Sequence, residues 1–536
     1  MAMASFAPSR HERLALGLGL ALLFLCLLPF AGSSIYNNDE FTYMSHARRI
    51  AAGQVPYRDF FEFIPPLPLW LHAAANHAGA PSLATTHALA ALLIGIAGVQ
   101  LYFLARRLGV GPWLAWLPGF TLLFGGYTHW AIYSHHWLVL PFELAALQLA
   151  MRGLTHPGWQ PWALAGLGVG FAGLSMQTDG AALGLLLAAG VMIDGWQRRE
   201  PVKLVVMRLA ALTAGTAVPV LAAAGILAAQ GALGAAFEDV VRWPLTQYRH
   251  PGGMNDVDVL TDLPTRLQPI TARPVWYFRV YHLLGLYALV LAAFVGAAAW
   301  GLAWIGRRLR GEGWTAEQGA LGLVGLWAIA SLLVCMRGNG DHVHVTCYAV
   351  PAFLWCTVGA ARLARLPGLP GTELLRWLPA LAVVGYMATG ALGQAKAMVQ
   401  DPGLWNRPLH PDFRLENSEI VRFLKAHMRP GDRMAAMPYA GFFHVYGPPP
   451  ATPYTFILTP EEGYGTHDQF DAFWAEVAKA RPRFIVVAPW AWDTWERTLR
   501  QYTDHLPPRY HLVGSFQNPQ YGNTFPAVVY MADEAP

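Results

Sequence analysis

The stretch YNNDEFTYMSHARRIAAGQVPYRDFFEFIPPLPLW, from Tyr36 to Trp70, directly follows a long apolar run. Its first charged residues are the adjacent carboxylates Asp39 and Glu40. A pair of carboxylates at the mouth of a membrane helix is costly unless it faces water, a cation or a substrate. The stretch therefore predicts a functional site at the end of the first apolar segment.

Residues 41–53 have the spacing of a short amphipathic helix. His46 and Arg49 fall on its polar side. The apolar side is made of Phe41, Met44, Ala47 and Ala51. We expect this helix to lie at a membrane surface.

The PYRDFF segment that follows this helix combines a guanidinium, a carboxylate and aromatic rings, and it is closed by the Pro65-Pro66 break. A segment of this kind at a membrane surface presents its charged and aromatic groups to whatever is held there. We expect Tyr57, Arg58 and Asp59 to contact a bound substrate.

The composition is that of a membrane protein. Of the 536 residues, 54% are hydrophobic and only 13% are charged, whereas soluble globular proteins carry about 25% charged residues. The net charge of +4 is too small, in a chain of this length, to indicate a nucleic-acid partner. The four cysteines lie in or beside apolar runs and lack the paired spacing of a zinc site.

A membrane-spanning helix needs about 20 apolar residues, and the sequence supplies about eleven such segments. They cover residues 14–35, 80–105, 111–128, 136–152, 162–178, 180–196, 203–229, 280–305, 317–335, 346–364 and 374–395. The basic residues between them place the N-terminus in the cytoplasm and the C-terminus outside it. On that assignment nearly every unusual polar residue of the hydrophobic part faces the outer side, in segments 36–70, 127–137, 177–179, 231–279 and 337–344. One outward-facing site, assembled from several loops, is the economical explanation.

The composition changes at about residue 397. The stretch NSEIVRFLKAHMRPGDRMAAMP predicts a helix, a turn and a short strand, and DQFDAFWAEVAKARPRFIVVAPW repeats this order with a buried strand at Phe484–Ala488. Helices alternating with apolar strands are typical of a small α/β domain. We therefore expect an α-helical polytopic membrane protein, with a transmembrane domain at residues 1–396 and an extracytoplasmic α/β domain at residues 397–536.

Asp39 and Glu40 are the primary candidates for chemistry. A carboxylate at a helix end can act as general base on an incoming hydroxyl, or can hold a cation that neutralises phosphate. A divalent cation, Mg²⁺ or Mn²⁺, is thus an open alternative at these two residues, and no cofactor is certain. The alternative is a structural role without chemistry, as a solvated pair of acids or as an acid that caps the following helix.

Four further candidates converge within the turn RGNGDHVH, which follows an apolar helix directly: Arg337, Asp341, His342 and His344. An arginine in this position suits a phosphate oxygen, and a histidine suits either phosphate or a proton relay. The competing interpretation is an interfacial turn with polar anchors.

The other candidates are polar residues at predicted helix ends. His135 and His136 are adjacent, so they are poorly placed to ligate one metal, and with their aromatic neighbours they favour sugar contacts or an interfacial belt. Gln177 and Asp179 lie at the end of a helix of small apolar residues. An acid in or near the bilayer is a functional candidate, and the alternative is a hydrated acid at a glycine-rich bend. Arg242 lies in an aromatic-basic cluster that binds anionic head groups or anchors the loop.

These residues together carry a resemblance to a known family. The chain resembles the GT-C superfamily of polytopic glycosyltransferases, in particular the bacterial branch related to protein O-mannosyltransferases and the lipid A aminoarabinose transferase. The resemblance covers approximately residues 14–395 and extends loosely to the C-terminal domain. The matching features are the Asp-Glu pair after the first helix, the GQVPYRDFFEFIPPL stretch, the QTDG segment and the RGNGDHVH turn.

The resemblance implies an inverting transferase of the bacterial inner membrane. Such an enzyme passes a sugar from a polyprenyl-phosphate donor to a hydroxyl acceptor on the outer face, which here is an envelope glycan, a lipid or a protein. Asp39 is then the first choice of base, with Glu40 assisting. Arg58, Arg337 and His344 are candidates for the donor phosphate. The large central luminal domain of the protein-mannosylating eukaryotic members is absent here, which argues against a protein acceptor.

Two other classes of function remain open. A secondary transporter would use Asp39, Asp179 and Asp341 as coupling groups, but transporters place such groups mid-membrane and often show two related halves. A non-catalytic envelope-assembly protein would explain the C-terminal domain but not the acidic and arginine-rich loops. The sequence indicates neither the sugar nor the acceptor.

Overall fold

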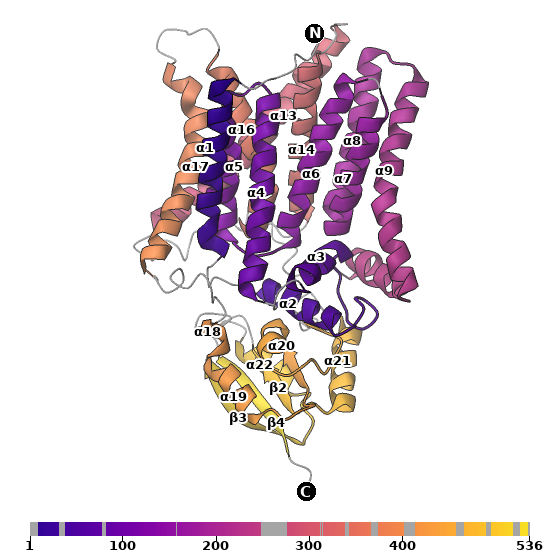
Figure 1. Cartoon of the computed structure of the whole chain (residues 1–536), viewed down its shortest axis with the longest axis vertical. Coiled ribbons are helices and arrows are strands. Elements are labelled where there is room, and N and C mark those ends of the chain that lie inside the picture. Colours follow the sequence, from indigo (N-terminus) through magenta and orange to yellow (C-terminus); the bar gives the residue numbers. More distant parts are fainter. Residues whose placement is uncertain are drawn as a thin grey trace.

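The computed structural model describes residues 9–31, 38–77, 82–156, 158–247, 276–310, 312, 315–337, 342–365, 373–400, 413–456, 466–488, 495–517 and 526–533. Long helices form a bundle at one end of the molecule, and a small sheet with its own helices lies at the other (Figure 1). The sequence expectation of a polytopic helical protein with a C-terminal α/β unit is confirmed.

The bundle helices follow the apolar runs of the sequence. Seven helices in the described part of the chain are long and apolar enough to cross a membrane, and three shorter apolar helical stretches accompany them. Each of the about eleven expected segments coincides with a helix or a run of helical turns, while the number of crossings stays a prediction. The helices are α1 (Arg10–Ala31), α4 (Leu83–Arg107), η1 (Leu114–Trp116), α5 (Leu117–Thr121), η2 (Leu122–Gly126), α6 (His135–Thr155), α7 (Gln160–Ser175), α8 (Gln177–Arg198), α9 (Val202–Ala229), α13 (Trp276–Leu309), α14 (Ala316–Arg337), α15 (His342–Tyr348), α16 (Val350–Leu363) and α17 (Glu373–Gln400).

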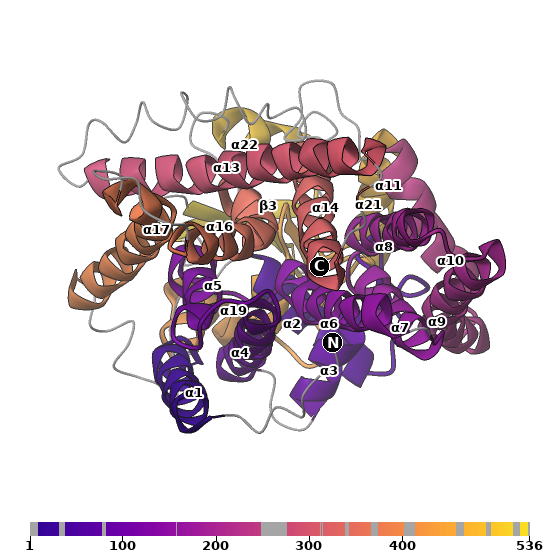
Figure 2. The ribbon, with the colours of Figure 1, turned by 90° about the horizontal axis from the view of Figure 1, so that it is seen from above.

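Small residues allow the closest contacts in the bundle. A methyl group added to Gly166 on α7 would meet the backbone oxygen of Leu212, and one added to Gly215 on α9 would meet that of Ala163. Close approach through small residues is how membrane helices gain packing energy without a hydrophobic driving force between them. Seen from above, α7 lies between α6 and α9, and α13 runs along the side formed by α14, α16 and α17 (Figure 2).

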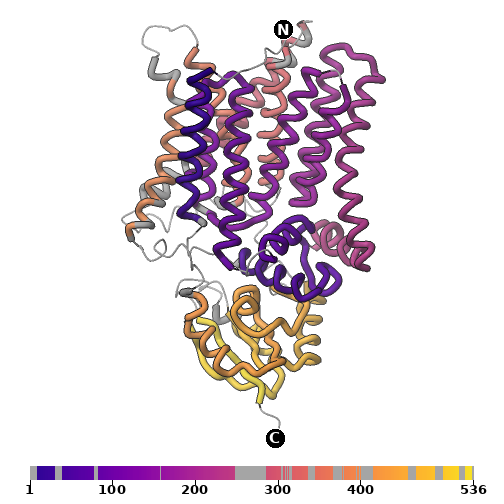
Figure 3. The backbone as a smooth tube through the Cα atoms, viewed as in Figure 1, coloured from indigo at the N-terminus to yellow at the C-terminus, as the bar shows by residue number. Residues whose placement is uncertain are grey.

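Short elements cover the end of the bundle that adjoins the C-terminal unit. They are α2 (Asn38–Ala51), α3 (Pro66–His77), η3 (Tyr127–His129), α10 (Leu233–Phe237), η4 (Glu238–Arg242) and α11 (Trp243–Thr246). The helix α2 lies between the bundle and the C-terminal unit (Figure 3). Phe41 and Met44 belong to the hydrophobic core of the C-terminal unit, and the Phe41 ring meets Phe442 edge-on at 5.2 Å.

One expectation about α2 is wrong. His46 and Arg49 were expected on a polar side exposed at a membrane surface, but their exposed fractions are 0% and 5%. The periodicity that predicts an amphipathic helix is real, but the C-terminal unit covers the polar side. Both polar side chains find hydrogen-bond partners there, which is the condition for burying them.

The C-terminal unit contains a four-stranded sheet in the order β1-β2-β4-β3. Strands β1 (Met434–Met437) and β2 (Phe484–Val487) are parallel, and β4 (Pro526–Ala532) is antiparallel to both β2 and β3 (Tyr510–Gln517). Alternate residues of β1 face opposite cores, because successive side chains of a strand point to opposite faces. The helices are α18 (Phe413–Glu416), α19 (Glu419–His427), α20 (Gly441–Tyr446), α21 (His467–Ala480) and α22 (Trp495–Thr503).

Candidate functional site

The first turn of α2 is anchored by Glu40. Its carboxylate is fully buried, and Oε1 accepts the backbone N–H of Tyr133 at 3.1 Å and lies 3.0 Å from Nε2 of His87 on α4. Glu40 therefore ties the start of α2 to α4 and to the segment that leads into α6. The neighbouring Asp39 is half-buried at this fixed helix start.

Tyr43 connects α2, whose first turn carries Asp39, to the start of α6. The two residues are one helical turn apart, so they share a face of α2. The Tyr43 hydroxyl lies 2.8 Å from Nδ1 of His135 and accepts the backbone N–H of the same residue at 3.3 Å. Burial raises the pKa of Tyr43 well above its usual value, and the charge of Asp39 contributes in the same direction. Tyr43 is therefore a neutral hydroxyl that ties the first turns of α2 to His135 at the start of α6.

Three histidines and a tryptophan form what we call the imidazole cluster: Trp130, His135, His136 and His344. The rings of His135 and His136 lie 4.1 Å apart, and His136 lies 5.1 Å from His344 of α15. Trp130 lies 5.5 Å from His136 and 5.8 Å from His344. Three residues that the sequence marked in two separate segments are thus neighbours in space, close to the start of α2.

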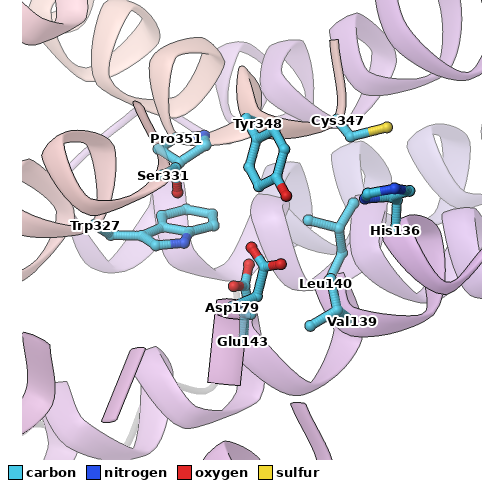
Figure 4. Close-up of a pocket in the computed structure, with 10 residues that line it drawn as sticks. All are labelled: His136, Val139, Leu140, Glu143, Asp179, Trp327, Ser331, Cys347, Tyr348 and Pro351. Carbon is cyan, nitrogen blue, oxygen red and sulfur yellow. The ribbon is translucent and has the colours of Figure 1, made fainter. Parts of the chain in front are cut away.

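His136 of the imidazole cluster also lines a small cavity inside the bundle, with a volume of about 10 Å³. The carboxyl groups of Asp179 and Glu143 point toward one another there, with the Tyr348 hydroxyl beside them (Figure 4). At this depth, two adjacent carboxyl groups need a proton or a cation between them. The lining residues are His136, Val139, Leu140, Glu143, Asp179, Trp327, Ser331, Cys347, Tyr348 and Pro351.

The structure places the PYRDFF residues apart from this cluster, in the loop between α2 and α3. Tyr57 is buried and donates its hydroxyl to the carbonyl of Ile64 at 2.8 Å. Arg58 pairs with Asp59 at 2.9 Å and donates to the carbonyl of Gln230 at 2.8 Å. All three side chains thus have structural partners within the protein.

Two further sequence candidates lie outside the cluster. Gln177, the first residue of α8, donates its amide to the carbonyl of Val240 at 3.3 Å. Arg242 is exposed in η4 and pairs with Glu238 at 3.0 Å. Both residues help to position the short helices that follow α9.

The RGNGDHVH turn is described only in part. Asp341 lies outside the described residues. Arg337 is the last residue of α14 and His342 is the first of α15, and their side chains are outside the described part of the chain as well. Of this turn, His344 alone has a described side chain.

A buried acid that the sequence did not mark, Glu62, joins α2 to the C-terminal unit. Its Oε2 lies 3.3 Å from Nδ1 of His46, and Nε2 of His46 lies 2.9 Å from the Thr455 hydroxyl. Burial raises the pKa of Glu62 to about 8, against the hydrogen bonds from the Ile64 and Phe63 amides and with the support of the nearby Asp239 and Asp39 charges. Burial also lowers the pKa of His46, with help from Arg49 and His72. The two facing atoms, His46 Nδ1 and Glu62 Oε2, make no hydrogen bond of good geometry at 3.3 Å, and burial favours the uncharged form of both side chains.

Glu62→Gln is expected to stabilise the protein more as the pH rises. The pKa of Glu62 in the folded protein is about 8, above the ordinary value of 4.5. Between these two pH values the unfolded chain has lost the Glu62 proton while the folded state retains it, so the wild type loses stability as the pH rises. Glutamine is neutral throughout and can still accept from Ile64 and donate to His46. The measurement is the apparent Tm of the purified chain between about pH 5 and about pH 8, with the exposed Glu419→Gln as control. Parallel pH profiles of wild type and Glu62→Gln would contradict the assignment.

Arg49 is the second buried charge at this junction. Its guanidinium donates to Gln54 Oε1 at 2.7 Å, to the Asp59 carbonyl at 3.1 Å and to the Thr452 and Pro453 carbonyls at 3.4 Å. It also lies over the Phe60 ring, 4.7 Å from the centroid. Burial lowers the pKa of Arg49 to about 10, which leaves it charged at neutral pH. One side chain therefore joins α2, the following loop and the C-terminal unit.

The proposed divalent-cation site at Asp39 and Glu40 does not fit the arrangement of Glu40. Divalent cations need several oxygen ligands that are open to the ion, whereas the carboxylate of Glu40 is fully buried against His87 and the Tyr133 amide. Among the described residues there is no group of three or more His, Cys, Asp or Glu side chains that could hold a metal. The arrangement of Glu40 therefore does not suit a divalent cation.

Sequence reasoning missed Tyr43, Glu62, Arg49 and Glu143 as parts of the site and its support. Glu143 had a usable signal, because it is an acid inside an apolar segment expected to cross the membrane. Tyr43 had none, because its partner His135 lies far along the chain. The partners of Arg49 and Glu62 include nearby residues, but the burial of this segment depends on its contacts with residues 452–455.

No protein-family model and no curated protein matches the sequence. Solved structures do match. ArnT from Cupriavidus metallidurans bound to undecaprenyl phosphate is 13% identical, with 98% of each chain covered and a TM-score of 0.51. The apo state of the same protein is 13% identical, covering 96% of this chain and 97% of that chain, with a TM-score of 0.54. The oligosaccharyltransferase from Archaeoglobus fulgidus in complex with Zn and sulfate covers 88% of this chain and 68% of its own, at 13% identity and a TM-score of 0.45. The chain shares the fold of the ArnT structures along nearly its whole length, which is the fold that the sequence resemblance implies.

Proposed function

We propose that this chain is a membrane glycosyltransferase that moves a sugar from a polyprenyl-phosphate donor to a hydroxyl acceptor. The observation that supports this most strongly is the ArnT fold along 98% of both chains, combined with an aspartate at the start of the helix that follows α1. The ArnT crystal holds undecaprenyl phosphate, so this fold accommodates a lipid phosphate. The acceptor is a hydroxyl of an envelope glycan, a lipid or a protein.

Asp39 is assigned the role of general base. In an inverting transfer the acceptor oxygen attacks the anomeric carbon while its proton passes to the carboxylate, and the bond to the phosphate oxygen breaks. The donor is already activated by its phosphate, so the protein has to place a base, neutralise the leaving phosphate and exclude water. Glu40, which is buried and paired with His87, is assigned to positioning.

The leaving phosphate is assigned to side chains in and just before α15. His344 lies in the imidazole cluster, and Arg337 ends the helix just before it. Arg58 has the weaker part, because it pairs with Asp59. We assign the sugar and the acceptor to His135, His136, Asp179, Asp341 and His342, and we give Tyr57, Asp59, Gln177 and Arg242 supporting roles around that space.

The proposed place is the bacterial inner membrane, with the N-terminus in the cytoplasm and residues 397–536 as an extracytoplasmic domain after the transmembrane domain at 1–396. Support comes from the position of α2, α3 and the C-terminal unit at one end of the bundle (Figure 1). The proposed boundary between residues 396 and 397 lies in the last turn of α17, which continues to Gln400.

The experiment that tests this function is mass spectrometry of envelope glycans and lipid-linked sugars from cells with and without the protein. We expect one polyprenyl-phosphate sugar to accumulate and one glycan to disappear when the protein is removed. An unchanged envelope would overturn the proposal. A transport defect with an intact glycan would instead indicate a secondary transporter.

Tyr43→Phe is expected to reduce transfer about tenfold while costing about 1–2 kcal/mol of stability, because it removes both contacts of the hydroxyl with His135, to Nδ1 and to the backbone N–H. The matched control is Tyr133→Phe, which removes the hydrogen bond from a neighbouring buried tyrosine to the Pro68 carbonyl at 2.8 Å. The measurements are the transfer rate and the apparent Tm of both variants. Equal losses of transfer in the two variants would show that Tyr43 acts through stability alone.

A further inference from the structure

In the C-terminal sheet, an arginine directly precedes each of the strands β1, β2 and β3. Because β1, β2 and β3 run in the same direction, Arg433, Arg483 and Arg509 come together at that end. The backbone fixes their order: the Arg483 N–H donates to the Arg433 carbonyl at 3.0 Å, and the Asp533 N–H donates to the Arg509 carbonyl at 2.8 Å. The register of the strands therefore holds the three arginines in a row.

Two more arginines complete a concave site at this end of the sheet. Arg481 ends α21 in the left-handed conformation, with a φ of 47°, and Arg429 lies in the turn after α19. Together with Asp432 and Asp533 the five arginines line a cavity of about 620 Å³. Binding pockets for small ligands are typically ~300–1,000 Å³. We call this cavity the arginine cavity.

The arginine cavity has an excess of three positive charges, since it holds five arginines and two aspartates. Both aspartates already have partners. Asp432 accepts the backbone N–H of Arg429 at 2.7 Å and lies 3.4 Å from Arg483 Nε, and Asp533 pairs with His511 at 2.6 Å. Among the described residues that line the cavity, positive charge therefore exceeds negative charge. Several guanidinium groups around one hollow are suited to phosphate, which they bind in a bidentate manner.

A second cavity leads from this site toward α2. It has a volume of about 530 Å³ and shares Arg433 with the arginine cavity. Its other lining residues include Arg49 and Asp59 at the junction with the bundle, and Gln54, Tyr454 and Glu476. Hydroxyl, amide and carboxylate groups of this kind hydrogen-bond to sugar hydroxyls. The two hollows thus offer a phosphate site and, beside it, a polar site lined by two arginines and two acids, whose charges balance.

We propose that the arginine cavity binds the phosphate group of a phosphorylated saccharide, and that the adjoining cavity holds its sugar. This site stands on the geometry of the C-terminal unit and is independent of the transfer reaction. The end of β4 lies at the side of the C-terminal unit away from the bundle (Figure 1), so the ligand approaches from outside the bundle. The saccharide phosphate is either a soluble glycan or the head group of a glycolipid.

The test uses the full chain purified in detergent micelles, with inorganic pyrophosphate, glucose 1-phosphate and free glucose as probes in a binding titration. The variant is Arg433→Gln combined with Arg481→Asn, because asparagine tolerates the left-handed backbone at position 481. We expect both phosphate probes to bind the wild type. Glucose 1-phosphate should have the larger binding free energy for each negative charge that it carries. The double variant should bind both probes at least about tenfold more weakly. Free glucose should not bind at a measurable level.

The matched control is Arg422→Ala, which removes an exposed arginine from α19 of the same unit, outside the arginine cavity. An equal loss in this control would show that surface charge alone holds the probes, and would overturn the proposal. Failure of both phosphate probes to bind the wild type would overturn it as well. Phosphatidic acid added to the same micelles separates the two sources: competition with glucose 1-phosphate supports a glycolipid head group, and absence of competition supports a soluble phosphorylated glycan. The apparent Tm of each variant confirms that it is folded.

Discussion

Asp39→Asn is expected to abolish sugar transfer, with a loss of about a thousandfold or more in turnover at unchanged amounts of folded protein. The substitution keeps the size of the side chain but removes its ability to accept a proton, and general-base catalysis contributes about 10²–10⁴-fold to enzyme rates. Cells that carry the variant should accumulate the polyprenyl-phosphate sugar. The measurement is the ratio of lipid-linked sugar to transferred product by mass spectrometry, at matched levels of the protein in the membrane.

The control for Asp39→Asn separates catalysis from helix stabilisation. Asp39 is the second residue of α2, and the exposed Asp468 is the second residue of α21. An acid in the first turn stabilises a helix by roughly 0.3–1 kcal/mol, so Asp468→Asn should cost that amount of stability and leave transfer unchanged. Near-normal transfer by Asp39→Asn, with the protein folded, would remove Asp39 from the role of base and leave the proposed mechanism without its proton acceptor.

The elements of the bundle could be predicted from the sequence because they depend on local composition. The length of an apolar run sets the length of a membrane helix, and even the closely spaced helices α6, α7 and α8 coincide with the runs expected at 136–152, 162–178 and 180–196. In the C-terminal unit β2 was expected as well, since FIVV is a short apolar run between a helix and a turn. The edge strand β3 was not, because most of its residues are exposed or half-buried and its pattern is weak.

The site could be predicted only in part, because its residues meet through tertiary contacts. Adjacent imidazoles at 135 and 136 and a third at 344 stood out as residue types, and the structure brings them together. The partners that hold them did not stand out. Tyr43 looked like an ordinary helix residue until its hydroxyl was placed beside His135. In the same way, the burial of His46 depends on Thr455, far along the chain.

Arg49→Ala is expected to loosen the C-terminal unit from the bundle, at a cost of about 3–5 kcal/mol. Arg49 is 5% exposed, and its guanidinium donates to three backbone carbonyls in two separate segments. Alanine leaves those carbonyls buried without their donor and also removes the contact with Phe60. Arg49→Lys should recover only part of the loss, because one ammonium cannot reproduce the planar fork.

The neighbouring residue provides the control for Arg49. Arg48 is exposed and reaches the C-terminal unit through a contact of 3.4 Å to the His444 carbonyl, so Arg48→Ala should cost less than about 1 kcal/mol. The measurement is hydrogen exchange of β1 and α20 in the full chain, with limited proteolysis between α17 and α18. We expect faster exchange and cleavage in Arg49→Ala alone. Because α2 carries both Arg49 and Asp39, a loosened unit should also displace the base, so transfer by Arg49→Ala should fall together with protection. Full activity in a variant whose C-terminal unit exchanges freely would show that the start of α2 is held by Glu40 and the bundle alone.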